Sequence, residues 1–570
     1  MPATQSDFVP ADINAAKWSE LEPLYKALLE RPVDSFEDFE RWLIDRSELD
    51  AASSEARARL YIRMTCHTGD EAISDAWSAY LDEVPPRLKP VAAKLDRRHV
   101  ELAERFASGN ERYMVLNRRT RNDVELFREE NVPLETEIEK LDQQYDKLCG
   151  AMMVEFDGET RTLAQMGRFM QSADRDVRER SWRTVAERRL QDKDAVDDIL
   201  DKMIELRHRC AKNAGFENFR DYQHRRFGRF DYAPKDCFAF HDAIEKHVVP
   251  FMRELDARRK KNLGVDPLRP WDLTVDEHAR PPLDPFKNGQ DLVERTRRVF
   301  DRLDPELADL FRSMGDDMGD CFDLDSRQGK ASGGYQYMRD RARSPFIFMN
   351  AAGLHRDVET MVHEAGHAFH SFLCRNDPIL AYRHSDIEFA EVASMTQELM
   401  TMPFWDEYYA DAGDANRART EQMEGSLVLL CWIATIDAFQ HWMYLNPKHT
   451  RDERRAYWLE LDERFGHSVS WEGLDEEREN LWQRQGHLFG HAFYYIEYGI
   501  AQLGALGIWL NALRHTPERA LADYKKALTL GGSRPLPELF EAAGVPFDFG
   551  EATVGLLVEA VRAELAKVPA

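Results

Sequence analysis

Apolar and charged positions alternate with the period of a helix over the first 150 residues, which contain few glycines. The clearest stretch begins at Pro133, and proline is tolerated in the first turn of a helix. A single apolar stripe follows at three- and four-residue spacing, formed by Leu134, Ile138, Leu141, Tyr145 and Leu148. The pattern predicts a helical N-terminal region.

The spacing of apolar residues is no longer helical at residues 153–156 and 159–162. In both runs apolar and polar side chains alternate, and Asp157-Gly158 lies between them. Asp-Gly between two such runs predicts a tight β-hairpin. Helical spacing resumes from residue 175 to residue 210 and breaks again at residues 215–222. Residues 264–286 carry five prolines, which exclude a long helix and predict a loop or an inter-lobe connection.

Two β-rich runs, residues 332–338 and 345–350, flank a charged turn at residues 339–343. We expect two strands that lead into the following helix. Such strands either close a small core sheet or offer an edge that pairs with an extended peptide. The pair Gly333-Gly334 favours the second interpretation, because bare backbone permits close approach.

The chain has 570 residues, more than one ordinary core accommodates, so two or more lobes are expected. We predict an N-terminal helical lobe at residues 1–204 and a second region at residues 205–570. A hydrophobic content of 43% and a charged content of 32% are typical of a globular protein. The formal net charge of -26 argues against nucleic acid as a main partner, since phosphate binding needs basic residues.

The cellular location is predicted from cysteines and apolar runs. The 7 cysteines are scattered without a CxxC pair, which fits reduced thiols in a cytosol. The start of the sequence has no apolar stretch of signal-peptide length. Residues 427–439 are the most apolar run, but Asp437 interrupts it and it is shorter than a membrane span. We therefore expect a cytoplasmic protein without a membrane partner.

The most informative motif is His363-Glu364-Ala365-Gly366-His367, within a segment of helical pattern. His363 and His367 lie four residues apart, so both imidazoles leave the same face of the helix and can share one metal ion. Glu364 is rotated away from that pair and is placed to contact a water on the metal. This donor set suits Zn²⁺, and a catalytic zinc site needs a third protein ligand and an open position.

Two glutamates compete as the third ligand. Glu391 and Glu388 lie one turn apart on a second predicted helix, and the residues alone do not choose between them. The longer HExxHxxGxxH pattern is absent, because position 370 is His and position 373 is Leu. His370 shares the face of the histidine pair and is interpreted as a neighbour of the site.

Further polar groups can support the metal or the substrate. Asp357 and Glu359 precede the histidines and either orient an imidazole or simply favour the helix start. Downstream, residues 487–498 combine His487 with tyrosines 494, 495 and 498 at helical spacing. Such a stripe either fills the core or supplies phenol and imidazole donors to a developing oxyanion.

These motifs together resemble the thimet oligopeptidase / oligoendopeptidase F family of zinc metallopeptidases. The resemblance covers about residues 205–565 and rests on several motifs in the same order, whereas the first 130 residues resemble the family only in being helical. The segments that carry it are 268–273, 332–335, 345–350, 356–358, 363–367, 389–394, 487–498 and 531–533.

The resemblance implies a mainly α, two-lobed clamshell with a deep channel and a small β-sheet beside the HExxH helix. It favours Glu391 over Glu388 and implies that His487 and a tyrosine bind substrate and stabilise the transition state. Ala492 stands where the family usually has proline, and among the tyrosines we favour Tyr498 and Tyr495 over Tyr494.

The function expected on this basis is zinc-dependent endopeptidase activity on short unfolded peptides. One Zn²⁺ on His363, His367 and Glu391 would activate a water, Glu364 would act as general base, and His487 with a tyrosine would bind the oxyanion.

Two alternatives remain open. The same zinc site could act as a peptidyl-dipeptidase or carboxypeptidase if an arginine such as Arg341, Arg343 or Arg484 captures the substrate carboxylate. The chain could also be a non-catalytic peptide-binding protein, against which the intact Glu364 argues.

Overall fold

The computed structural model describes residues 7–315, 320–327, 329–331 and 333–568. Ser332, part of one predicted strand segment, lies outside this range. The chain is mainly α-helical with two small sheets, which confirms the predicted fold class.

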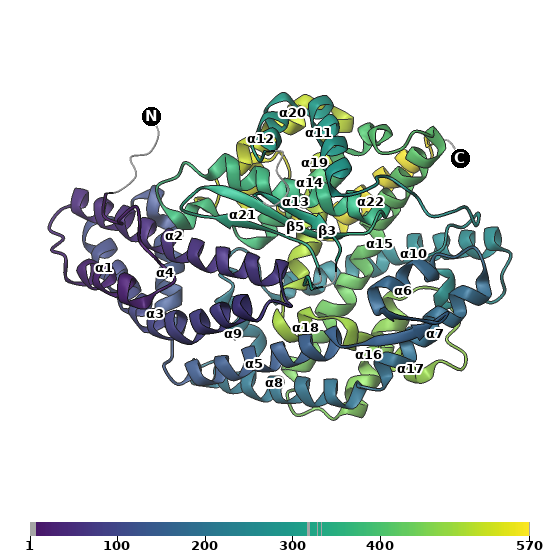
Figure 1. Cartoon of the computed structure of the whole chain (residues 1–570), viewed down its shortest axis with the longest axis horizontal. Coiled ribbons are helices and arrows are strands. Elements are labelled where there is room, and N and C mark those ends of the chain that lie inside the picture. The colour runs from purple at the N-terminus through teal and green to yellow at the C-terminus, as the bar shows by residue number, and fades with distance from the viewer. Residues whose placement is uncertain (1–6, 316–319, 328, 332, 569–570) are drawn as a thin grey trace.

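The first four helices form the left part of the molecule in Figure 1, and the fifth lies at the bottom beside α8 (Lys193–Asn213). The N-terminal helices form the first part of the chain. They are α1 (Trp18–Glu30), α2 (Phe36–Cys66), α3 (Glu71–Phe106), α4 (Met114–Leu126) and α5 (Asn131–Gly150), with the 3-10 turn η1 (Glu111–Tyr113). Ser35 accepts a bond of 3.1 Å from the backbone N–H of Asp38, which caps the start of α2. The predicted helical N-terminal region is confirmed.

The predicted hairpin is present as β1 (Met153–Phe156) paired antiparallel with β2 (Glu159–Thr162). Asp157 and Gly158 both adopt positive φ, of 51° and 81°, as a tight turn of this kind requires.

Three helices follow the hairpin: α6 (Leu163–Met170), α7 (Arg175–Leu190) and α8 (Lys193–Asn213). The expectation of one continuous helix from residue 175 to residue 210 is wrong, because the chain breaks between α7 and α8. α7 packs against β1 and α8 packs against α5, so the two segments need different axes.

The next part of the chain contains α9 (Phe219–Arg226), α10 (Pro234–Leu263), η2 (Pro270–Asp272), α11 (Gly289–Leu303) and α12 (Pro305–Arg312). Within the proline-rich segment 264–286 only the short turn η2 is regular, as expected. Asp272 in this turn accepts bonds from Arg178 at 3.0 Å and from Arg175 at 2.8 Å, which joins the loop to α7.

The second sheet has the strand order β3-β5-β4, formed by β3 (Phe322–Asp325), β4 (Tyr335–Arg339) and β5 (Ser344–Ala351). β4 and β5 are the two predicted strands and pair antiparallel, whereas β3 was not predicted and runs parallel to β5. Although far away in sequence, α2 contacts β4 (Figure 1). Thr65 of α2 and the Tyr335 hydroxyl are 2.6 Å apart.

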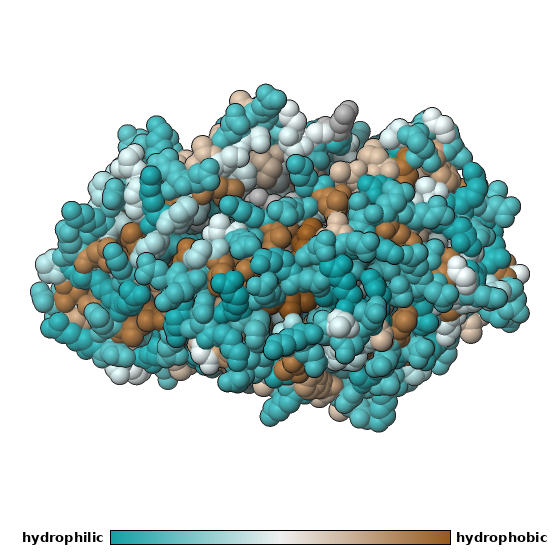
Figure 2. Space-filling view, turned by 90° about the horizontal axis from the view of Figure 1, so that it is seen from below, coloured by the Kyte–Doolittle hydropathy of each residue, from teal (hydrophilic) through white to brown (hydrophobic). Residues whose placement is uncertain are grey.

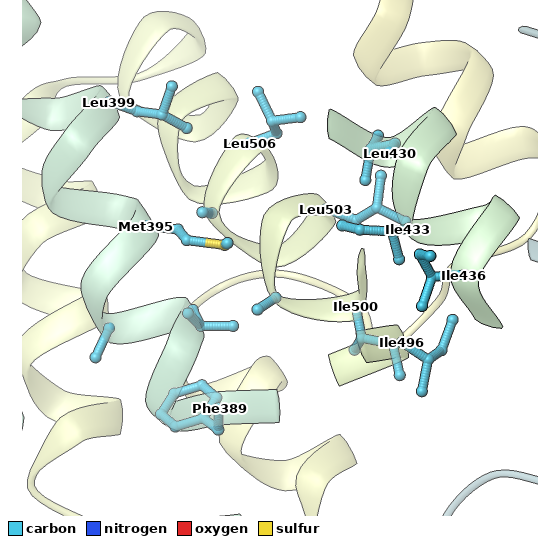
Figure 3. Close-up of a cluster of buried hydrophobic side chains, with 14 of the residues drawn as sticks. Phe389, Met395, Leu399, Leu430, Ile433, Ile436, Ile496, Ile500, Leu503 and Leu506 are labelled. Carbon is cyan, nitrogen blue, oxygen red and sulfur yellow. The ribbon is translucent and has the colours of Figure 1, made fainter. Parts of the chain in front are cut away.

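The helices around the sheet build the main core. They are α13 (His355–Cys374), η3 (Leu380–Arg383), α14 (Ile387–Met400), η4 (Met402–Glu407), α15 (Ala412–Leu445), α16 (Arg451–Phe465), α17 (Asp475–Glu479), η5 (Leu481–Arg484), α18 (His487–Gly490), α19 (Tyr495–Arg514), α20 (Pro517–Leu528), α21 (Leu536–Ala542) and α22 (Glu551–Leu565). Figure 3 shows α19 between α14 and α15, with Met395, Leu503 and Ile433 among the buried contacts.

One helix, α15, is long and apolar enough to cross a membrane by length and composition. However, 72% of its most apolar window is buried inside the protein, which is typical of a core helix. The face in Figure 2 is mainly hydrophilic with apolar residues in small patches, in keeping with the high content of charged residues.

Buried apolar side chains form two large clusters. One extends from Val9 to Tyr113 with Ile379 and Tyr382, and the other from Leu126 to Val561. The division of the chain at residue 204 stays a prediction.

Candidate metal centre

The histidine pair lies in the middle of α13. The carboxylate of Asp357 accepts bonds from the backbone N–H groups of Leu354 and Ala352, at 2.9 and 2.8 Å, and so fixes the start of this helix. Two turns on, His363 and His367 project from one face, with ring centroids 5.0 Å apart and ring planes at 84°. The spacing therefore places the two imidazoles as predicted for a shared ion.

A glycine between the histidines brings the second helix close. A Cβ atom on Gly366 would lie 2.6 Å from both the Ala393 carbonyl oxygen and the Ser394 Cα of α14, a distance that no real Cβ tolerates. Because only hydrogen occupies this position, α13 and α14 cross in direct backbone contact.

This crossing sets Glu391 opposite the histidines. Its Oε2 lies 3.3 Å from His363 Nε2 and 3.5 Å from His367 Nε2. Ser394 donates to the same oxygen at 2.9 Å. Burial alone would raise the pKa of Glu391, but the two imidazoles hold it well below its ordinary value, so the carboxylate is ionised.

The competing glutamate faces elsewhere. Glu388 accepts a bond of 2.7 Å from the Tyr232 hydroxyl and lies 3.8 Å from Arg229 Nε. His370 is buried beside Phe389, and burial lowers its pKa to about 3. The structure thus gathers His363, His367 and Glu391, one donor atom of each within 4.8 Å of the others.

The group that orients the first imidazole is Glu398, which the sequence analysis missed. His363 Nδ1 lies 2.7 Å from Glu398 Oε1, and Gln422 donates to the other oxygen at 2.9 Å. The two earlier candidates act differently: Asp357 caps the helix, and Glu359 lies 3.3 Å from His355. Glu398 is seven residues after Glu391, hence two turns along the same helix face, and this spacing is the signal that could have found it.

Glu364 lies off the histidine pair, as its position in the motif predicts. Its side chain is 6% exposed, and within the described residues its Oε2 has no hydrogen-bond partner. Burial raises the pKa of this carboxyl. A Cβ on Gly334 would lie 3.2 Å from Thr360 Cγ2 of α13, so the glycine lets the chain before β4 approach the metal helix closely.

The tautomer of His487 follows from two neighbours. The indole N–H of Trp432 can only donate, and it lies 2.9 Å from Gln485 Oε1, which identifies that atom as the carbonyl oxygen. The amide nitrogen of Gln485 therefore donates to His487 Nδ1 at 2.8 Å, and the ring proton stays on Nε2. Burial lowers the pKa of His487 to about 4, so the ring is a neutral donor at pH 7.

The three tyrosines have different surroundings because residues 487–498 do not form one helix. Phe493 adopts φ of 68°, and α19 begins only at Tyr495. The Tyr494 hydroxyl donates to Glu391 Oε1 at 3.2 Å. Tyr498 packs with its ring centroid 5.3 Å from that of Tyr494, and Tyr495 lies 5.1 Å from the His487 ring.

Tyr494, which ranked below the other tyrosines on sequence, is thus the one whose hydroxyl contacts the ligand set. The roles of Tyr495 and Tyr498 stay predictions.

The donor set fits one zinc ion. Two imidazoles and a carboxylate at this spacing are a donor set that suits a catalytic zinc site, which keeps one position open. His363 is held by Glu398, and Glu391 is held by Ser394 and Tyr494, which are supporting contacts of the kind that metal ligands usually have.

Two of the three arginines proposed for carboxylate capture are engaged in other contacts. Arg341 donates to the carbonyl of Pro10 at 2.7 Å, and Arg343 lies 3.2 Å from Glu48. Arg484 stacks on Trp432 at 4.9 Å, and burial lowers its pKa to about 10.

The chain is similar to known proteins in sequence and in fold. A sequence profile described as "Peptidase family M3" matches residues 168–554, and one described as "Peptidase M3 N-terminal domain" matches residues 8–127. An oligoendopeptidase F homolog from Borreliella burgdorferi is 24% identical over 394 residues, 65% of this chain and 62% of that protein.

A second oligoendopeptidase F homolog, from Lactococcus lactis subsp. lactis, is 28% identical over 157 residues, which are 28% of this chain and 25% of that protein. The chain therefore spans less than two thirds of the length of either relative. A solved structure described as PZ peptidase A with inhibitor 2 has a TM-score of 0.89 at 28% identity, over 98% of this chain and 99% of that one.

Proposed function

Because the chain belongs to peptidase family M3, we propose that it is a zinc-dependent endopeptidase that hydrolyses peptide bonds in short oligopeptides. The observation that carries the proposal is the meeting of His363, His367 and Glu391 beside a buried Glu364 whose Oε2 has no partner among the described residues. The cytoplasmic location stays part of this proposal.

His363, His367 and Glu391 would hold the ion, and a zinc ion bound there would lower the pKa of a water and polarise the scissile carbonyl. Glu364 accepts the proton of the attacking water and delivers it to the leaving amine. Its raised pKa suits this exchange, since a general base works best when its pKa approaches the working pH.

The oxyanion is stabilised by donors of this chain. His487 offers Nε2–H as a neutral imidazole, and a tyrosine of the 494–498 group offers a hydroxyl. Removing one such donor typically costs about 3 kcal/mol of transition-state stabilisation.

The substrate backbone is proposed to pair with β4. This strand is at the outer position of its sheet and contacts both α2 and the metal helix α13. Main-chain pairing binds an extended peptide without reading its side chains, which suits short unfolded substrates.

The test is Glu364→Gln, which keeps the shape of the side chain but removes the base. We expect about one zinc per catalytic site to be retained while turnover of a quenched fluorescent peptide falls by about 10³-fold. Wild-type activity should be lost on chelation and return with Zn²⁺. A zinc-loaded, active Glu364→Gln variant would contradict the assignment of the base, and an inactive, peptide-binding wild type would favour a non-catalytic role.

A further inference from the structure

A second group of metal-type donors lies outside the proposed active site. One donor atom each of His224, Cys237 and His441 lies within 4.8 Å of the other two. They come from three different helices, α9, α10 and α15, and are 5%, 0% and 2% exposed. In the described part of the chain, only this group and the His363 group meet the same donor criterion.

The imidazoles of this group lack the hydrogen bonds that buried polar atoms normally make. Among the described residues neither Nδ1 nor Nε2 of His224 has a hydrogen-bond partner, and the same holds for His441 Nδ1. Unsatisfied buried nitrogens are rare in native proteins and call for a missing partner.

A carboxylate lies beside one imidazole of the group. Asp437 Oδ2 lies 3.3 Å from His441 Nε2, which equals the spacing between Glu391 and His363 at the proposed catalytic site. Asp437 Oδ1 has no hydrogen-bond partner in the described residues. His241 Nε2 lies 2.9 Å from Asp437 Oδ2 and can orient this carboxylate.

Aromatic rings lie beside the donor group. The rings of Phe493 and Phe238 pack against His441 at centroid distances of 5.3 and 4.9 Å. Phe493 is fully buried, whereas Phe238 is exposed. Arg229 is 2.7 Å from Glu497 and 3.8 Å from Glu388, so it is paired with carboxylates outside the donor group.

We propose that His224, Cys237 and His441 bind a second zinc ion. Imidazole nitrogen and thiolate sulfur are both ligands that zinc takes in proteins. On binding, the Cys237 thiol loses its proton to solvent and the sulfur takes the metal bond. The ion would join α9, α10 and α15 behind Phe493, the residue that precedes Tyr494.

The first experiment counts metal in the full-length protein, purified without chelator in the presence of Zn²⁺. We expect two zinc ions per chain in the wild type, one in Cys237→Ser, and one in the double variant His363→Ala/His367→Ala. Cys431→Ser is the matched control. Cys431 is buried like Cys237, but it lies on α15 and outside the donor group. This variant should keep both ions.

The second experiment can be read in the wild-type protein, so its result does not depend on how a variant folds. Loading with Co²⁺ should give a sulfur-to-cobalt charge-transfer absorption in the wild type and in the His363→Ala/His367→Ala variant, because Cys237 is the only thiol in either donor group. Cys237→Ser should lack this band.

Wild-type protein without the sulfur band, or with a single zinc that disappears in the double histidine variant, would overturn the second site. The result is independent of the proposed function: a sulfur band in a protein without peptidase activity supports the second site and contradicts only the enzyme assignment.

Discussion

At the scale of single residues, the protonation of His487 is set by atoms that do not touch the metal ligands. Trp432 fixes the amide of Gln485, and that amide fixes the imidazole with its proton on Nε2. The donor that the proposed mechanism needs is therefore prepared before substrate binds. Such preorganisation contributes to the transition state more than to binding.

Replacing Gln485 by Leu should lower kcat by about tenfold with little change in KM, since a transition-state contact is weakened. Trp432→Phe should also lower kcat, because the Trp432 indole affects His487 only through the Gln485 amide. The double variant should be no worse than Gln485→Leu alone, as expected for two residues in one chain of bonds. Additive losses in steady-state kinetics would show that Trp432 acts separately, through packing.

Acid stability depends on another histidine, far from the metal site. His99 is 1% exposed and lies 2.8 Å from Asn117 Oδ1 through Nε2. Burial lowers its pKa to about 4, from an ordinary value of about 6.5 in the unfolded chain. Between these values the unfolded state binds more protons, so this stabilisation is present above pH 6.5 and is lost as the pH falls towards 4.

His99→Gln keeps a donor for Asn117 but does not titrate. Between pH 7.5 and pH 5 the wild type should lose about 2 kcal/mol more unfolding free energy than this variant. Urea unfolding at the two pH values, followed by tryptophan fluorescence, measures the difference. His67→Gln, at an exposed histidine, is the matched control and should follow the wild type. Equal pH dependence in all three proteins would contradict the role of His99.

At the scale of elements, the metal centre depends on how closely α13 and α14 cross. Gly366→Ala would place a methyl group 2.6 Å from backbone atoms of α14, which cannot move aside as a side chain can. We expect a loss of about 1–3 kcal/mol of stability and weaker zinc binding, because Glu391 moves away from the histidines.

The control for this change is Gly425→Ala on α15, where an added Cβ meets nothing within 4 Å. It should be neutral or stabilise by up to about 1 kcal/mol through helix propensity. Thermal unfolding measures the stability of both variants, and zinc titration measures their affinity for the ion. A Gly366→Ala variant with wild-type zinc affinity would show that the crossing tolerates the methyl group.

The same elements show what the sequence could predict. His363, His367 and Glu364 lie on one helix, so their relative directions follow from helical periodicity alone. Glu391 could be preferred over Glu388 only through family resemblance, because the choice depends on how two helices cross. Once Glu391 is chosen, the seven-residue spacing along the same helix points to Glu398, a signal that was not used.

The contact of Tyr494 with Glu391 was not predicted, because it depends on a local backbone feature. Helical spacing was applied across residues 487–498, but positive φ at Phe493 interrupts the helix and changes the direction of every later side chain. Nothing in the residue types marks this break, since a phenylalanine rarely adopts positive φ. Strand β3 was missed because it pairs parallel with β5 and so has no hairpin turn beside it, whereas Asp157-Gly158 marked the equally short strands β1 and β2.

At the scale of the whole molecule, the N-terminal helices and the sheet are joined through α2. Ser54 donates to Asp340 at 2.6 Å, and Glu48 lies 3.2 Å from Arg343. The charged turn between β4 and β5 is thus occupied by contacts to the N-terminal part of the chain. Arginines of this turn are therefore poorly placed to capture a substrate carboxylate, which favours the endopeptidase over the carboxypeptidase alternative.

The two alternatives differ in their dependence on free peptide ends. We expect an octapeptide and its acetylated, amidated form to be cut at the same internal bond, with kcat/KM differing by less than tenfold, or about 1.4 kcal/mol. Mass spectrometry of the products gives the bond and the rate for each. The remaining candidate for carboxylate capture is Arg484, so Arg484→Gln should reduce cleavage of both peptides equally. If amidation slows cleavage a hundredfold and Arg484→Gln removes that difference, Arg484 binds the substrate terminus and the enzyme is a carboxypeptidase or peptidyl-dipeptidase.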